Sequence, residues 1–256
     1  MTPDKWDADA ITPHLSLRDA ASCFRVLPPE YLVVNRFSGD RETARHARNA
    51  IRRSRENAAH RHTQVTRKNL TSYDNALAFA FKYPRCQGDG RFNTSASAGV
   101  LYASFQERTA LAERAYQQVR LLREKYGALT MAITMIGVTR IAFDIQPCWI
   151  ADVTSPPFNT HPGWSSPDSD YQDTQIFADN ARKSEAAGVF YSSARDRVDG
   201  TNLALFDYQC LAQRQLDRRR LRDWFMSATA TTVDMQTSAG AHERFSFDRD
   251  GVPCPP

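Results

Sequence analysis

The chain has 256 residues, of which 41% are hydrophobic and 24% are charged, and its formal net charge is +4. These values are typical of a globular protein that buries a substantial core in one or two domains. No stretch approaches the roughly 18–20 uninterrupted apolar residues of a membrane helix, and the N-terminus lacks the basic and apolar regions of a secretory signal. We therefore expect a cytoplasmic protein without membrane contact, with signal-independent secretion as an effector left open.

Cysteine and histidine usage argues against a disulfide framework and against a metal site. The five cysteines are widely spaced, odd in number and without a CxxC pair, so we expect reduced thiols. The six histidines form no HExxH motif, and His46, His60 and His62 lie in a basic stretch that would repel a cation. No metal is expected.

The first third of the chain is predicted to contain an arm, one strand and two helical stretches. Residues 1–30 are interpreted as an N-terminal arm with a short helical piece around Leu17–Phe24. A compact apolar run at Tyr31–Val34 favours a strand. Residues 40–68 are polar and compatible with a helix, and Ser72–Lys82 predicts a short helix.

The positive charge is concentrated between Arg36 and Lys68. This stretch holds ten Lys or Arg residues against Asp40, Glu42 and Glu56. Such a run is typical of nucleic-acid binding, but no aromatic residue follows Phe37 to stack on bases. We favour a solvated helix or a surface facing protein or phosphate, and binding of nucleic acid is the less favoured alternative.

The strongest predicted helix lies in the middle of the chain. A loop over Pro84–Asn93 and a short buried strand over Gly99–Ser104 precede it. The helix spans Gln106–Lys125, lacks Gly and Pro, and is closed by Gly127. Its apolar stripe is formed by Leu111, Ala115, Val119 and Leu122. At 100° per residue, Glu113 lies roughly 200° from Leu111 and projects away from that stripe.

The second half mixes strands and helices without regular alternation, which favours an α+β fold. The expected elements are strands at Thr130–Gly137 and Arg140–Ile145, a loop at Val153–Asp170, a helix at Thr174–Ala187 closed by Gly188, and strands at Val189–Ser192 and Thr201–Phe206. The remainder, including Phe245–Phe247, is interpreted as edge strands or tail.

Common catalytic templates are absent, but three residues form a regular series. The chain contains no GxGxxG after a strand, no Walker A motif and no GxSxG. Arg91 in a glycine loop, Tyr102 in a strand and Glu113 in a helix are each eleven residues apart. A loop, a strand and a helix in this order can fold back so that all three side chains meet at one cleft.

The segments around this series resemble the RES-domain (Arg-Glu-Ser) family. The first is GDGRFNTSASAGVLYASFQERTALAERAYQ, and the second is DTQIFADNARKSEAAGVFYSSARDRVDGTNLALFD. Upstream, VVNRFSG is similar to the opening strand of the family. The resemblance covers residues 88–122 and 172–207 well and 31–102 loosely. It implies a catalytic domain over 31–226 with a basic insertion at about 40–70 and a loop insertion at about 153–170, followed by C-terminal strands or a tail at 227–256.

The resemblance implies a fold related to ADP-ribosyltransferases and an enzyme that cleaves the nicotinamide–ribose bond of NAD+. Phosphate is the acceptor in characterised members, and many members are toxins of toxin–antitoxin pairs. Expected partners are therefore NAD+ and an antitoxin or immunity protein. No cofactor is expected, because NAD+ is the substrate and inorganic phosphate a co-substrate. A homo-oligomer is left open.

The family pattern assigns roles to residues of this chain. Glu113, Arg91, Tyr102 and Ser193 match the catalytic positions, and Arg36, Asn93 and Ser192 match substrate-binding ones. A carboxylate at Glu113 would stabilise an oxocarbenium-like ribose. Arg36 and Arg91 would bind phosphates through bidentate hydrogen bonds, Tyr102 would contact the nicotinamide ribose, and Ser193 would fix a hydroxyl or phosphate oxygen.

Two departures from the family pattern leave alternatives open. Phe92 stands where the family usually has Trp, and 55 residues separate Arg36 from Arg91. The sequence leaves the acceptor open between phosphate, water and a macromolecule. ADP-ribosyl transfer to a macromolecule is therefore the first alternative to NAD+ degradation. A non-catalytic nucleic-acid-binding module built on residues 41–68 is the second.

Overall fold

The computed structural model describes residues 6–27, 77, 80–81, 89–94, 96–127, 134–166, 170–196, 198–212, 220–248 and 252–254. The predicted strand at Tyr31–Val34, the basic segment 40–70 and Arg36 lie outside these residues. The described part of the predicted helix Ser72–Lys82 is helical at Leu77, Ala80 and Phe81.

Ten strands of the described residues form one mixed sheet in the order β1-β5-β6-β7-β3-β2-β4-β8-β9-β10. The strands are β1 (Leu15–Arg18), β2 (Ala21–Leu27), β3 (Leu101–Ser104), β4 (Thr134–Ile145), β5 (Cys148–Asp152), β6 (Gly188–Ser192), β7 (Thr201–Leu205), β8 (Leu221–Ala228), β9 (Thr232–Gln236) and β10 (His242–Ser246). Three described α-helices and three short 3-10 helices accompany them: α1 (Ala8–Ile11), α4 (Glu107–Tyr126), α5 (Gln172–Lys183), η2 (Thr12–His14), η6 (Pro162–Trp164) and η7 (Tyr208–Cys210). The predicted α+β class is confirmed.

The sheet opens between its two central strands. β2 pairs with β4 along its whole length, from Ala21 to Leu27, and β3 pairs with β7 at all four residues. Between β2 and β3, however, only Phe24 and Ser104 are paired. Beyond that pair the two strands diverge, so the sheet consists of two halves that meet at one point.

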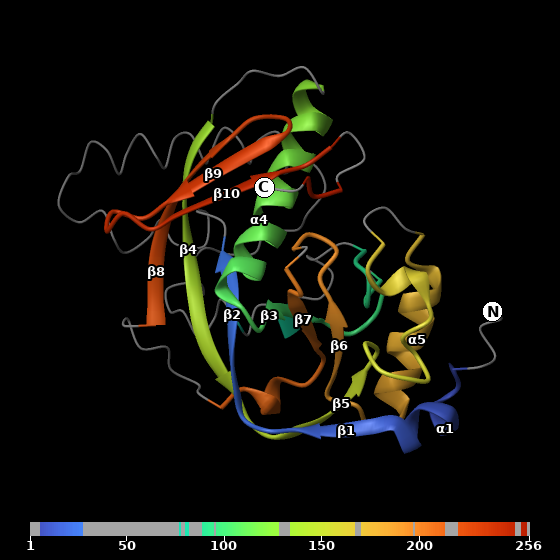
Figure 1. Cartoon of the computed structure of the whole chain (residues 1–256). Coiled ribbons are helices and arrows are strands. Elements are labelled where there is room, and N and C mark those ends of the chain that lie inside the picture. The colour runs from blue at the N-terminus through green and yellow to red at the C-terminus, as the bar shows by residue number, and fades with distance from the viewer. Residues whose placement is uncertain are drawn as a thin grey trace.

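The helix α4 lies in front of this opening, with β9 and β10 on one side and β6 and β7 on the other (Figure 1). Its apolar stripe, Leu111, Ala115, Val119 and Leu122, is buried against residues of β8, β9 and β10. α4 ends where predicted, since the cap Gly127 has φ 80°. Because this face of α4 is buried, the other face of the helix, which carries Glu113, is turned toward the divergent strands.

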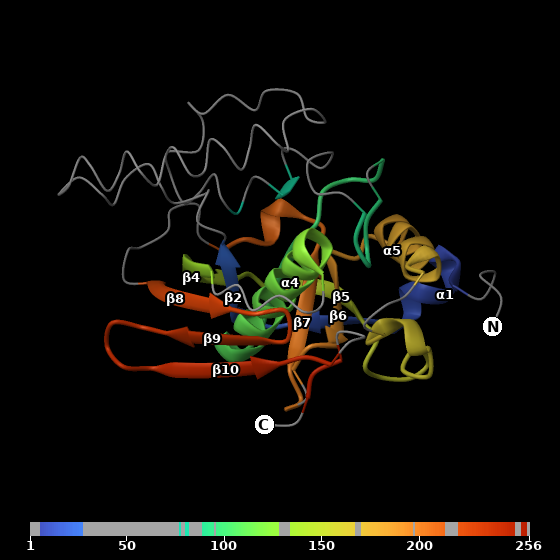
Figure 2. The same cartoon turned by 90° about the horizontal axis from the view of Figure 1, so that it is seen from above.

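The helix α5 lies at the other end of the molecule, beside α1 (Figure 2). It packs in an aromatic cluster in which Trp6, Trp164 and Phe177 are in ring contact. None of the helices that the structure describes is long and apolar enough to span a membrane.

Several predictions from local pattern are wrong. The expected helical piece at Leu17–Phe24 is part of β1 and β2, and β2 is a central strand, so residues 15–27 are not an arm. Strand pairing to β4 and β5, which the local pattern does not contain, determines this outcome. The two strands expected at Thr130–Gly137 and Arg140–Ile145 are the single strand β4.

The predicted end of the second helix is also wrong. α5 ends at Lys183 rather than at Ala187, and Glu185 takes a left-handed conformation with φ 61°. Gly188 begins β6 instead of closing the helix. Glycine is needed at this position for another reason, because a Cβ there would lie 2.6 Å from the Ala204 carbonyl oxygen of β7. The predicted boundary at residue 226 falls inside β8, and β5 was not predicted.

Candidate active site

A cavity of about 440 Å³ lies where β2 and β3 diverge beneath α4. This volume falls in the range of about 300–1,000 Å³ that is typical of small-molecule sites. Its described lining residues are Phe24, Arg25, Val26, Asp89, Gly90, Arg91, Asn93, Tyr102, Ala103, Ser104, Ala110, Glu113, Arg114, Tyr116, Gln117, Arg120, Tyr171, Tyr191, Ala194, Arg195 and Asn202. Arg91, Tyr102 and Glu113 therefore meet at one cleft, as their spacing predicts.

Glu113 is held in the cavity by two neutral donors. Its Oε1 accepts hydrogen bonds from Ser193 Oγ at 2.8 Å and from Asn202 Nδ2 at 2.7 Å. Hydrogen bonds from neutral groups orient a carboxylate without cancelling its charge. Among the described contacts no donor reaches Oε2, which leaves this oxygen to a ligand.

The two donors to Glu113 are themselves fixed. Asn202 Oδ1 accepts from Ser104 Oγ at 2.6 Å, so the side-chain amide must present its NH2 group to Glu113. Ser193 Oγ accepts from the backbone N–H groups of Arg195 and Asp196, both at 3.1 Å. The Ser193 hydroxyl proton is thereby directed toward Glu113.

The start of α4 anchors the turn that carries Ser193. Asp196 is 6% exposed, accepts from Thr109 Oγ1 at 2.8 Å and pairs with Arg108. Both partners belong to the first turn of α4, the helix that also carries Glu113. One helix therefore places the carboxylate and the turn that orients it.

Tyr102 closes the glycine loop rather than pointing a free hydroxyl at the cavity. Its hydroxyl donates to Asn93 Oδ1 at 2.8 Å and accepts from the Phe92 N–H at 2.9 Å. Burial raises the pKa of Tyr102 well above its ordinary value, so the phenol stays neutral. A Cβ at Gly90 would lie 2.6 Å from Asn93 Oδ1, and glycine is therefore required there.

Arg91 lines the cavity and also binds the 153–170 loop. Its guanidinium donates to the carbonyl oxygens of Gly163 and, at 2.6 Å, of Ser166. The same group lies 5.0 Å from the centroid of the Tyr171 ring. Two of its five donors are thus used to hold the predicted loop insertion against the glycine loop.

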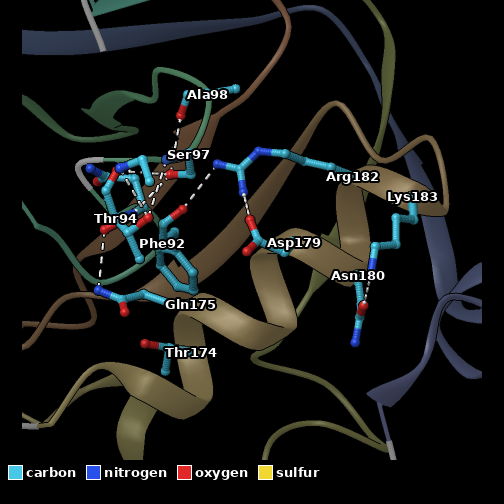
Figure 3. A network of polar contacts seen from close by, with 12 residues as sticks. Phe92, Thr94, Ser97, Ala98, Thr174, Gln175, Asp179, Asn180, Arg182 and Lys183 are labelled. Carbon is cyan, nitrogen blue, oxygen red and sulfur yellow. Dashed lines mark hydrogen bonds and ion pairs between the residues drawn. The ribbon is translucent and has the colours of Figure 1, made fainter. Parts of the chain in front are cut away.

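Side chains of α5 bind each carbonyl of the loop Gly90–Asn93. Gln175 Nε2 donates to Gly90 at 2.9 Å and to Asn93 at 3.2 Å, and Thr174 Oγ1 donates to Arg91 at 2.6 Å. Arg182 donates to Phe92 at 3.0 Å, and Figure 3 shows it reaching that carbonyl from the helix. We call these three side chains the α5 clamp.

Not all predicted site residues lie in the cavity. Asn93 lines it but is 3% exposed and bonded to Tyr102. Ser193 contacts Glu113 without lining the cavity, and Ser192 is exposed at the end of β6 and does not line it. Arg36 lies outside the described residues.

The structure adds site residues that the sequence did not single out. Asn202 lies in the quoted segment GTNLALF, where a Gly-x-Asn pattern before a strand was the available signal. Arg25 reaches the cavity from β2, in a segment that was predicted to belong to the N-terminal arm. Arg195 is 5% exposed with its guanidinium 3.3 Å from the Tyr116 ring centroid. These three depend on strand pairing and helix packing.

No group of three or more His, Cys, Asp or Glu side chains among the described residues is arranged to hold a metal ion. Cys23, Cys148, Cys210 and Cys254 are free cysteines.

The family model described as RES domain matches residues 59–227, the segment that contains Arg91, Tyr102, Glu113 and Ser193. A chain in the crystal structure of the M. tuberculosis MbcT–MbcA toxin–antitoxin complex is similar at 14% sequence identity and a TM-score of 0.48, with 87% of this chain and 93% of that chain covered. No curated protein sequence gives a significant match.

Proposed function

Because the chain belongs to the RES-domain family, as the segments around Arg91 and Ser193 predict, we propose that it degrades NAD+ by cleaving the bond between nicotinamide and ribose. The observation that carries this proposal is the carboxylate of Glu113, which lines a cavity of about 440 Å³ with Oε1 fixed by Ser193 and Asn202. A fixed carboxylate is the group that the reaction requires beside the ribose.

The proposed reaction breaks the C1′–N bond of the nicotinamide ribose. The bonding electron pair leaves with the nicotinamide ring, which becomes neutral, and positive charge develops on the ribose. The carboxylate of Glu113 stabilises this oxocarbenium-like state through Oε2 and can accept a hydrogen bond from the 2′-hydroxyl. An oxygen of hydrogen phosphate then bonds to this C1′ carbon to give ADP-ribose 1″-phosphate, or water bonds to it and releases a proton to solvent to give ADP-ribose.

The proposal includes a biological role as a toxin that depletes cellular NAD+ and is restrained by an antitoxin. This role is supported by family membership, because many members are toxins of toxin–antitoxin pairs. Expression of the wild-type chain should therefore arrest growth as NAD+ falls. Expression of a Glu113→Gln chain should not.

Product analysis of the purified protein tests the proposal. Incubation with NAD+ should release nicotinamide, with ADP-ribose 1″-phosphate as co-product if phosphate is the acceptor and ADP-ribose if water is. Mass spectrometry with and without phosphate separates the two routes. Intact NAD+ under both conditions would refute the proposal, and an ADP-ribose mass shift on an added macromolecule would instead favour ADP-ribosyl transfer.

A further inference from the structure

The helix α4 presents two opposite faces, and the face that lines the cavity is cationic beyond Glu113. The lining residues Ala110, Glu113, Arg114, Gln117 and Arg120 are spaced at three or four residues along one side of the helix. Arg114, Gln117 and Arg120, which we call the cationic stripe, follow the carboxylate in order. A ligand lying along α4 would meet the carboxylate first and the stripe next.

The distances along the helix suit a dinucleotide. At 1.5 Å per residue, Gln117 lies about 6 Å and Arg120 about 10 Å beyond Glu113 along the axis. In NAD+ only the ribose ring and its exocyclic carbon separate the scissile bond from the pyrophosphate. If the scissile bond lies at Glu113 and the ligand runs along α4 toward the C-terminal end of the helix, the pyrophosphate lies beside the stripe.

The charge of the cavity favours an anionic ligand. Among the described residues that line it, five are arginines and two, Asp89 and Glu113, are acidic. This excess of three positive charges attracts phosphate groups, because a concave site of one charge sign focuses its field on the ligand.

Arg114 Nη2 donates to Gln118 Oε1 at 3.3 Å. The ion pair of Arg120 is weak enough to exchange for a phosphate. Arg120 pairs with Glu124 at 3.3 Å, and both side chains are more than 60% exposed. Exposed pairs of this kind contribute little stability. Arg91, by contrast, uses two donors on backbone carbonyls of the 153–170 loop.

We infer that the cationic stripe binds the pyrophosphate of a dinucleotide whose scissile bond lies at Glu113. This inference rests on the proposed function and assigns the phosphate-binding role to the exposed side of α4. It makes the stripe a determinant of substrate class, because a substrate without phosphates gains nothing from it.

Binding of ADP-ribose tests the inference without turnover. In a Glu113→Gln background, Arg114→Gln/Arg120→Gln should weaken ADP-ribose binding by about tenfold for each arginine, because each forms charge-assisted hydrogen bonds. The matched control is Arg222→Gln/Arg244→Gln, which removes the same charge on β8 and β10 outside the cavity. Calorimetric titration of the two double variants measures the difference.

Kinetics with two substrates provide the second readout. In the otherwise wild-type protein, the stripe variant should raise KM for NAD+ by about a hundredfold and leave kcat/KM for nicotinamide riboside, which has no phosphate, unchanged. Arg120→Gln alone should give about a tenfold effect on NAD+, and its exposed position leaves the fold intact.

Three outcomes would overturn the inference. The first is equal ADP-ribose affinity in the stripe and control variants, and the second is a loss of kcat/KM for nicotinamide riboside as large as that for NAD+. The third is a raised KM for inorganic phosphate with ADP-ribose binding unchanged, which would assign the stripe to binding of the acceptor phosphate. If wild type fails to cleave NAD+ while ADP-ribose binding still depends on the stripe, the proposed function fails separately from the binding site.

Discussion

At the scale of single residues, the central feature is a carboxylate with one oxygen bound and one open. Oε1 of Glu113 accepts from Ser193 and Asn202, and each donor is oriented by a further hydrogen bond, from backbone N–H groups or from Ser104. Pre-oriented groups of this kind need no rearrangement when charge develops on the substrate. Asn202 is therefore a positioning residue for Glu113.

Changing Asn202 tests this positioning. Asn202→Ala should lower kcat/KM for NAD+ by about 10- to 100-fold, because a misplaced group of this kind loses much of its effect. Asn202→Asp keeps the shape of the side chain but removes the donor and puts a second negative charge beside Glu113, so kcat should fall further than in Asn202→Ala. Asn159→Asp, on an exposed loop, adds the same charge and should leave kcat unchanged. A kcat equal to wild type in Asn202→Ala and Asn202→Asp would show that Asn202 has only a structural role.

At the scale of elements, side chains of α5 hold the conformation of the glycine loop. The loop Gly90–Asn93 carries Arg91 into the cavity, and the α5 clamp of Thr174, Gln175 and Arg182 binds its four carbonyls. A loop without regular structure is otherwise free to vary in conformation. The clamp makes a helix distant in sequence part of the active-site support.

Loosening the clamp should reduce both activity and stability. Gln175→Ala removes two hydrogen bonds to the loop, and we expect kcat/KM for NAD+ to fall about tenfold while the free energy of unfolding falls by about 1–2 kcal/mol. Lys183→Ala serves as the control, since Lys183 is exposed on the same helix and bonds only Asn180 among the described residues. Activity equal to wild type in Gln175→Ala, measured at a temperature where both proteins are folded, would contradict the clamp.

At the scale of the whole molecule, the two halves of the sheet meet at a single strand pair, and the cavity lies where they diverge. In the half containing β2, β4 and β8, Asp144 of β4 accepts from Ser22 of β2 at 2.6 Å and pairs at 2.6 Å with Arg220, the residue before β8. Although partial burial raises the pKa of Asp144, the hydrogen bonds from Ser22 and Arg220 lower it below its ordinary value.

This pairing predicts a pH-dependent part of the stability. Because the folded pKa is depressed, the contribution is present above the ordinary aspartate pKa of about 4 and is lost as the pH falls through the folded pKa. Asp144→Asn should lower the melting temperature by about 2–4 °C at pH 7, which corresponds to about 1 kcal/mol, and by progressively less as the pH is lowered from about 4 through the folded pKa. Asp9→Asn, at an exposed position, should change neither the melting temperature nor its pH dependence. A deficit of Asp144→Asn that stays constant as the pH is lowered would contradict this account.

The local pattern predicted what depends on local sequence and missed what depends on pairing. The helix carrying Glu113 and its closing glycine were predicted because a long uninterrupted apolar stripe and a Gly cap determine them. The strand β2 was not, because its partners β3 and β4 lie more than seventy residues away. Arg25 and Asn202 were missed for the same reason, since their places in the cavity follow from the order of strands.

The most direct test of the whole account is nicotinamide release from NAD+ by the purified chain, compared between wild type, Glu113→Gln and Glu185→Gln. Glu185 is exposed in the turn after α5 and does not line the cavity, so its variant receives the same chemical change away from the site. The account predicts release by wild type and Glu185→Gln and a loss of at least about a thousandfold in Glu113→Gln, because stabilisation of the developing charge is removed. Equal rates in wild type and Glu113→Gln, or no release by either, would contradict it.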